Sequence, residues 1–182
     1  MHMALETRAW TRADLQRLPD DGNRYEVLAG ELFVTPAPSA FHQRIVAWLS
    51  AVITPFVVAH GIGVVHQARS VMVVDDSELE PDLMVLPRAP FDAWENAPTP
   101  ILVVEVISKS TRRRDRDEKR RFYLEKGVAE YWVVDRYTRS VIRFRPSGQE
   151  AITTVLTWVP LGTEATLDVD VAMMFSQILP AS

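Results

Sequence analysis

Two acids and a lysine have the types and the spacing of a site that could hydrolyse a phosphodiester. Glu105 lies in the middle of the apolar run 101–107, where an ionised carboxylate is costly unless a cation meets it. Asp82 stands at the entrance of another short apolar stretch, and Lys119 follows on a predicted helix. Two carboxylates can bind Mg²⁺ while a lysine orients the attacking water or stabilises the transition state. The alternative is structural, with Glu105 in an ion pair and Lys119 on the surface beside Asp115.

The run 101–107 is the element that must hold Glu105 in place. Six of its seven residues are apolar, which is typical of a central strand covered on both faces. A helix is predicted after it, ending at Lys126 because Gly127 is a favoured residue just past a helix end. Phe122 and Tyr123 should face the sheet, so Lys119, one turn earlier, points inward or along the sheet edge.

The rest of the chain predicts an α/β fold with a central mixed β-sheet flanked by helices. Residues 25–34 read as a hairpin, and an amphipathic helix follows in which Pro55 produces a kink or an early end. The acidic segment 75–80 is expected to be a linker. The other expected elements are strands at 64–67, 71–74, 81–86, 130–134, 141–144 and about 152–158, and short helices at 11–18 and 171–179.

Composition restricts the function classes. The chain has 182 residues, no cysteine and a net charge of −4, so we expect one domain without disulfides or thiolate chemistry. We expect no secretory signal, because the start of the sequence has no basic region followed by an apolar core, and no membrane-spanning helix, which needs an apolar run of roughly 20 residues, so a cytoplasmic protein is expected. Residues 109–121 carry eight Lys/Arg and three Asp/Glu. This local charge of +5 lies beside Glu105, which favours a polyanionic partner.

Several motifs together resemble the Uma-type family of proposed bacterial endonucleases, within the PD-(D/E)XK, restriction-endonuclease-like superfamily. The matching segments are Pro81-Asp82, Val104-Glu105-Val106-Ile107-Ser108, Arg114-Asp115 with Lys119 and Tyr123, and Gly127-Val128-Ala129-Glu130-Tyr131-Trp132. The resemblance implies a single restriction-endonuclease-like domain over 1–182. Its core spans about 24–145, with an N-terminal helix and a C-terminal strand and helix packed on it. It also implies that Asp82 and Glu105 are metal ligands.

The chain departs from the superfamily pattern at the lysine. That pattern has a lysine two residues after the second acid, and Ile107 stands there. The resemblance suggests that the amine has moved to Lys119, although Lys109 shares the strand parity of Glu105 and is a rival. Glu31, His42 and Tyr123 are candidates for a supporting role around the three catalytic residues.

The sequence therefore predicts a Mg²⁺-dependent DNA endonuclease in which Mn²⁺ can substitute. Four arginines are candidates for binding the phosphate backbone: Arg112, Arg113, Arg114 and Arg116. A homodimer is expected because two paired sites can cut both strands of a duplex, and no membrane contact is expected. Two alternatives stay open, namely a non-catalytic module of the same fold that binds nucleic acid or protein, and an RNase.

Overall fold

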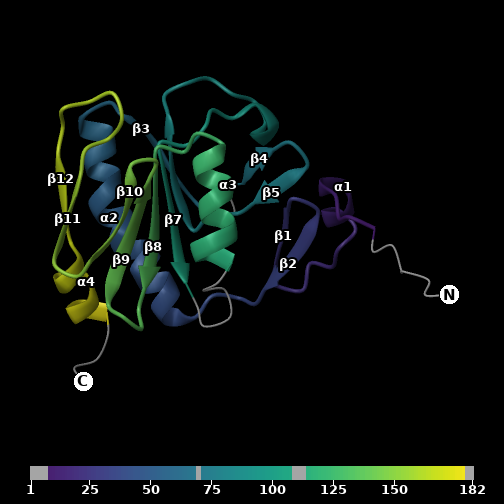
Figure 1. Cartoon of the computed structure of the whole chain (residues 1–182), viewed down its shortest axis with the longest axis horizontal. Helices are drawn as coiled ribbons and strands as arrows, with labels where there is room; N and C mark the ends of the chain where they lie inside the picture. Colours follow the sequence, from purple (N-terminus) through teal and green to yellow (C-terminus); the bar gives the residue numbers. More distant parts are fainter. Residues whose placement is uncertain (1–7, 69–70, 108–113, 179–182) are drawn as a thin grey trace.

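A six-stranded mixed sheet forms the centre of the molecule (Figure 1). The structure is a computed structural model that describes residues 8–68, 71–107 and 114–178, with the backbone alone at Arg114 and Asp115. The strand order is β10 (Gly148–Ile152), β9 (Ser140–Arg145), β8 (Glu130–Asp135), β7 (Leu102–Ile107), β6 (Leu83–Pro87) and β3 (Gly63–Gln67). The β7–β8 pair is parallel and the other pairs are antiparallel. The predicted mixed sheet with a fully buried central strand is confirmed.

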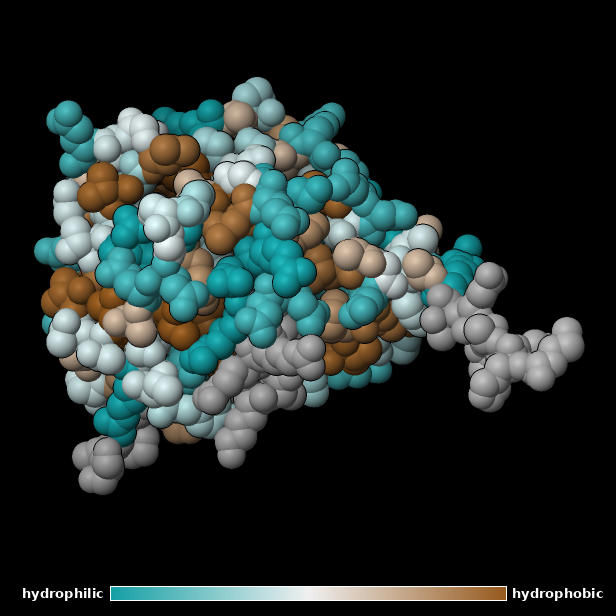
Figure 2. Space-filling model, viewed as in Figure 1, coloured by the Kyte–Doolittle hydropathy of each residue, from teal (hydrophilic) through white to brown (hydrophobic). Residues whose placement is uncertain are grey.

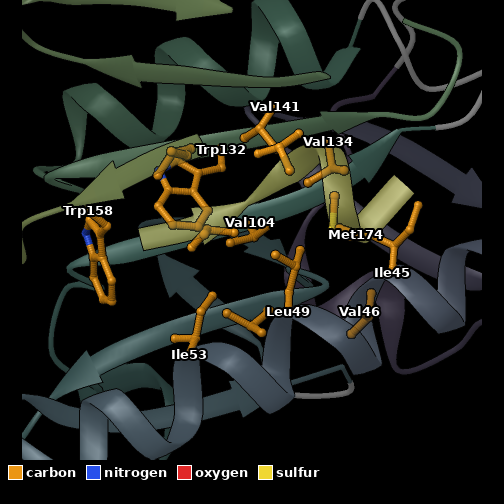
Figure 3. Packing of buried hydrophobic residues seen from close by; sticks show 14 of the residues in the cluster. Ile45, Val46, Leu49, Ile53, Val104, Trp132, Val134, Val141, Trp158 and Met174 are labelled. Carbon is orange, nitrogen blue, oxygen red and sulfur yellow. The ribbon is translucent and has the colours of Figure 1, made fainter. Parts of the chain in front are cut away.

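Helix α2 (Ala40–Ala59) covers one face of this sheet (Figure 1). It begins after Ser39, whose Oγ accepts a hydrogen bond from the backbone N–H of His42 at 3.3 Å. The helix continues four residues beyond Pro55, so the predicted early end is wrong. Its apolar stripe packs on inward side chains of the sheet to form the larger core (Figure 3). The helical members are Ile45, Val46, Leu49, Ile53, Phe56 and Val57.

By length and composition alone, α2 could cross a membrane. The expectation that no apolar stretch reaches that length is therefore wrong for this helix. Six of its side chains are buried against the sheet, and this is the packing of a core helix.

The opposite face carries a smaller, four-stranded sheet in the order β2 (Glu31–Thr35), β1 (Arg24–Leu28), β5 (Ser77–Leu79) and β4 (Met72–Val74). The predicted hairpin is confirmed. Its turn uses Ala29 and Gly30 with φ of 50° and 87°, because a two-residue hairpin turn needs left-handed backbone. The linker predicted at 75–80 is wrong, since β5 lies within it and pairs with both β1 and β4.

The helical segment after β7 covers the same face as the small sheet (Figure 1). It starts as a π-helix, η2 (Arg114–Lys119), and continues as α3 (Arg120–Glu125). Gly127 follows with φ of 85°, as the predicted helix end requires. Hydrophilic residues gather over this segment on the surface seen in Figure 2. Below it lies a second apolar cluster that includes Val103, Tyr123 and Tyr131.

The ends of the described chain pack on these layers. The last elements are β11 (Val155–Trp158), β12 (Leu167–Asp170) and α4 (Val171–Ile178), which join the core over α2. The single strand predicted at about 152–158 is wrong, because β10 and β11 belong to different sheets. At the other end, α1 (Arg12–Leu15) is shorter than predicted. The loop before β7 holds one turn, η1 (Trp94–Asn96).

Candidate active site

Strands β6 and β7 bring the two predicted acids together. Leu83 pairs with Val104, and this register places Asp82 opposite Glu105 at the next position of the antiparallel pair. Side chains of directly opposite residues lie on the same face of a sheet. Here it is the face of the smaller core, which also contains Val103. Asp82 is 2% exposed and Glu105 is 1% exposed, so both carboxylates need partners inside the protein.

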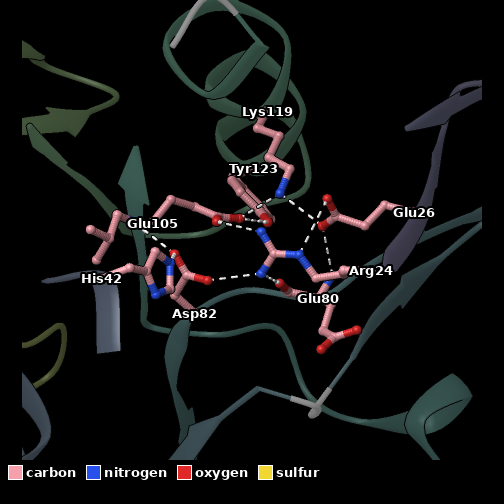
Figure 4. A network of polar contacts seen from close by, with 9 residues as sticks. Arg24, Glu26, His42, Glu80, Asp82, Glu105, Lys119 and Tyr123 are labelled. Carbon is pink, nitrogen blue, oxygen red and sulfur yellow. Dashed lines mark hydrogen bonds and ion pairs between the residues drawn. The ribbon is translucent and has the colours of Figure 1, made fainter. Parts of the chain in front are cut away.

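Both oxygens of Asp82 accept hydrogen bonds (Figure 4). Its Oδ2 accepts from His42 Nε2 at 2.9 Å and from the backbone N–H of Val106 at 2.7 Å. Its Oδ1 accepts from Arg24 Nη1 at 2.8 Å. Burial by itself would raise the pKa of the Asp82 carboxyl, but the bond from His42 and the charge of Arg24 hold that pKa well below its ordinary value. Asp82 is therefore an anion at neutral pH.

Lys119 joins Glu105 to a third acid, Glu26 of β1. Lys119 Nζ donates to Glu105 Oε1 at 2.7 Å and to Glu26 Oε1 at 2.8 Å, and the lysine is fully buried. The hydroxyl of Tyr123 also donates to Glu105 Oε1, at 3.1 Å. Burial, followed by the charge of Glu105, raises the pKa of the Tyr123 hydroxyl well above its ordinary value, so this group remains a donor. The surface pairing of Lys119 considered from its spacing is excluded.

Two members of the site, Arg24 and Glu26, were missed by the sequence reasoning. The Arg24 guanidinium lies between the acids, with Nη2 at 4.0 Å from Glu105 Oε2 and Nε at 3.9 Å from Glu26 Oε2. One signal was available, because Glu26 interrupts the apolar pattern of the predicted strand, and Arg24, just before that strand, has the same parity. Arg24, Glu26, Asp82, Glu105 and Lys119 are called the charged cluster below (Figure 4).

The π-helical turn positions Lys119 as the last residue before α3. A π-helical turn is rare and is frequently found at functional sites. Arg116 of the same turn donates from Nη2 to Asp135 Oδ2 at 2.7 Å, at the end of β8. The turn is thus fixed to the sheet by Arg116 and to the charged cluster by Lys119.

A cavity of about 500 Å³ opens beside the charged cluster. Its lining includes Arg24, His42, Asp82 and Val106, together with Arg136. Lys119 is fully buried behind these residues. A ligand in this cavity would therefore meet Arg24 and Asp82 first.

Comparisons with known proteins give the family. The Uma2 family, described as "Putative restriction endonuclease", matches residues 12–174. The chain belongs to the Uma2 family. A comparison with curated proteins found no match. Among solved structures, the Uma2 chain is similar to one titled "Crystal structure of a putative nuclease belonging to DUF820 from Anabaena variabilis ATCC 29413", with a TM-score of 0.76 and 21% identity over 93% of this chain and 99% of that one. This likeness, with the family match, confirms the predicted restriction-endonuclease-like fold.

In this Uma2 member, Ile107 stands where the superfamily pattern has a lysine, and the structure shows what each of the two positions contributes. Ile107 is 2% exposed and packs in the smaller apolar cluster with Tyr123, so the position two residues after Glu105 supplies apolar contact. The amine instead reaches Glu105 from the helical segment, through Lys119. Lys109, the rival amine, lies outside the described residues.

Of the remaining predicted site residues, some contact the charged cluster and others do not or lie outside the described residues. His42 and Tyr123 contact the two acids directly. Glu31 is exposed at the start of β2 and makes no described contact with the charged cluster. It stands opposite Leu28, next to the hairpin turn, two positions along the strand pair from Glu26 and Phe33. Arg112 and Arg113 lie outside the described residues, and of Arg114 only the backbone is described.

Proposed function

We propose that the chain is a Mg²⁺-dependent endonuclease that hydrolyses DNA phosphodiester bonds, with Mn²⁺ as a substitute. The observation that carries this proposal is the convergence of two carboxylates on one cation position, with a buried lysine beside them and a cavity at the edge. Arg24 Nη1 lies 2.8 Å from Asp82 and Nη2 lies 4.0 Å from Glu105, so both acids face the same point. A purely structural ion pair needs neither the second acid nor the cavity.

The donor set fits a hard divalent ion. Carboxylate oxygens are the ligands that Mg²⁺ prefers, and Mg²⁺ is commonly held by one or two carboxylates with waters and substrate phosphates as its other ligands. The protein ligands of such an ion would be Asp82 and Glu105. A bound ion would activate water and neutralise charge on the phosphate.

The surrounding residues orient these ligands and supply charge. His42 and the Val106 backbone hold one oxygen of Asp82, while Lys119 and Tyr123 hold one oxygen of Glu105. Hydrogen bonds of this kind fix the direction of metal ligands. The Lys119 ammonium would stabilise negative charge that develops on the phosphate, without reorganisation during the reaction.

The local charge supports a nucleic-acid substrate. Residues 109–121 carry eight Lys/Arg and three Asp/Glu in a chain whose net charge is −4. Lysine and arginine neutralise backbone phosphates, and Arg114 and Arg116 of η2 belong to this basic segment. A cytoplasmic location, and a homodimer that presents one site to each DNA strand, are parts of the same proposal.

Nicking of supercoiled plasmid tests the proposal. The purified chain is incubated with Mg²⁺, with Mn²⁺ or with EDTA, beside Asp82→Asn, and circular dichroism checks that the variant is folded. We expect nicking with either ion and none with EDTA or with the variant. Cleavage of RNA alone would replace the proposal by an RNase. DNA binding without cleavage or metal binding would replace it by a non-catalytic module.

A further inference from the structure

Arg24 occupies the position that a divalent ion would take between Asp82 and Glu105. Its guanidinium donates to Asp82 Oδ1 at 2.8 Å and lies 4.0 Å from Glu105 Oε2 (Figure 4). It also donates to the backbone carbonyl of Glu80 at 2.9 Å. The side chain is 17% exposed, so this positive charge is largely withdrawn from water and is held by the acids.

Each acid turns one oxygen towards Arg24. Oδ2 of Asp82 accepts two hydrogen bonds, from His42 and Val106, while Oδ1 faces the guanidinium. Oε1 of Glu105 accepts from Lys119 and Tyr123, while Oε2 faces the guanidinium. An ion that bound both acids through these inner oxygens would have to take the place of the guanidinium.

The charges of the cluster lead to the same conclusion. Among the five residues of the cluster, three carry negative charge and two carry positive charge, a formal sum of −1 for these residues alone. A divalent ion added while Arg24 stays in place would lie against a like charge in a buried environment, where repulsion is only weakly screened. Departure of Arg24 removes this repulsion.

The neighbouring cavity has room for the Arg24 guanidinium. Arg24 lines this space of about 500 Å³ together with His42 and Asp82. Within the described part of the chain, Arg24 Nε is buried without a hydrogen-bond partner, so a rotation of the side chain breaks no hydrogen bond at that nitrogen. A guanidinium in the cavity would keep its charge near an incoming phosphate.

We propose that Arg24 is a resident cation that competes with the metal, filling the position between Asp82 and Glu105 in the metal-free protein and moving into the cavity when a divalent ion binds. This rests on the proposed function, because it assumes that the two acids are metal ligands. It adds a residue that regulates the metal affinity of the site. The metal-free protein is thereby stabilised at the expense of that affinity.

Mn²⁺ binding, measured from the free-ion signal in electron paramagnetic resonance, tests the competition without any activity assay. The full chain is compared with Arg24→Gln and with Arg136→Gln. The second variant loses the same charge at the cavity, but its described contacts are with Phe41 and Tyr137. We expect Arg24→Gln to bind Mn²⁺ about tenfold more tightly or better, because removal of a competing state raises apparent affinity. Arg136→Gln should change the affinity by less than about threefold.

The outcomes separate this proposal from the proposed function. Mn²⁺ binding by the wild type with equal or weaker binding by Arg24→Gln would overturn the competition and leave the metal site intact. No binding by any of the three proteins would overturn both. A wild-type crystal soaked in Mn²⁺ gives a test that does not depend on the folding of a variant. We expect the guanidinium to lie in the cavity, and an ion bound between the two acids beside an unmoved Arg24 would contradict the proposal.

Discussion

Glu105 and Glu130 are both buried glutamates on neighbouring parallel strands, at 1% and 5% exposure, yet their surroundings differ. Glu105 faces the smaller core, where a lysine and a tyrosine hydroxyl donate hydrogen bonds to it and the lysine also binds a second acid, Glu26. Glu130 accepts from Trp132 Nε1 at 2.6 Å and has Arg143 Nη1 at 3.7 Å. Trp132 shares its strand parity and belongs to the larger core.

The pKa shifts of the buried acids have opposite directions around Glu130 and in the charged cluster. Burial raises the pKa of Glu130, and the indole and the arginines oppose this only in part. At the charged cluster, the partners of Asp82 outweigh burial and lower its pKa. The difference shows that a buried acid is not by itself a site. Several acids gathered around a common cation position, next to open space, can bind a metal.

The largest effect on stability is expected from Lys119→Met, which removes the buried ammonium that donates a hydrogen bond to Glu105. Glu26 and Glu105 would lose a buried partner, and breaking such a pair costs about 3–5 kcal/mol of the free energy of unfolding. The matched control is Lys126→Met at the end of the same helical segment, whose ion pair with Asp75 is exposed and should contribute about 0–1 kcal/mol. Urea denaturation measures both. If both variants lost the same free energy of unfolding, the claim that Lys119 stabilises the charged cluster would be contradicted.

His42→Ala should lower the cleavage rate roughly 10–100-fold, because the ring orients Asp82 from outside the metal position. His60→Ala is the control, since His60 lies after the other end of α2 and its Nδ1 hydrogen bonds the carbonyl of Phe56. That variant should cleave within about twofold of the wild type, the range of a surface change away from the site. Plasmid nicking rates measure both, and a greater loss for His60→Ala would contradict the assigned role.

The smallest effect is a difference in the pH dependence of stability. The pKa of Asp82 is lowered from 3.8, so the advantage of the wild type over Asp82→Asn should be present above pH 3.8 and fall as the pH drops below it. The pKa of Glu130 is raised from 4.5, so the wild type should lose stability relative to Glu130→Gln as the pH rises above 4.5. Chemical denaturation at a series of pH values should give slopes of opposite sign. Parallel curves for the two variants would contradict the comparison.

The site residues that could be predicted from the sequence are those that a local pattern of neighbouring residues reveals. An apolar run with one acid predicted β7 and Glu105, and helical spacing brought Lys119 towards the sheet. Arg24 and Glu26 lie on a hairpin far from these residues in the chain, and local spacing carries no information on which strands will pack together. β5 was missed because its residues, Ser77–Leu79, form too short a segment to show the strand alternation.

Nicking by Glu105→Gln and by Glu130→Gln, measured side by side with Mn²⁺, tests the central claim most directly. The two substitutions are chemically identical, and both are made at buried acids of neighbouring strands. The account predicts that Glu105→Gln loses nearly all nicking, because a neutral amide is a poorer ligand for a hard divalent ion than a carboxylate, and that Glu130→Gln, which is remote from the charged cluster, cuts at a rate within about twofold of the wild type. Full activity of a folded Glu105→Gln, or equal losses in both variants, would contradict the assignment of the active site.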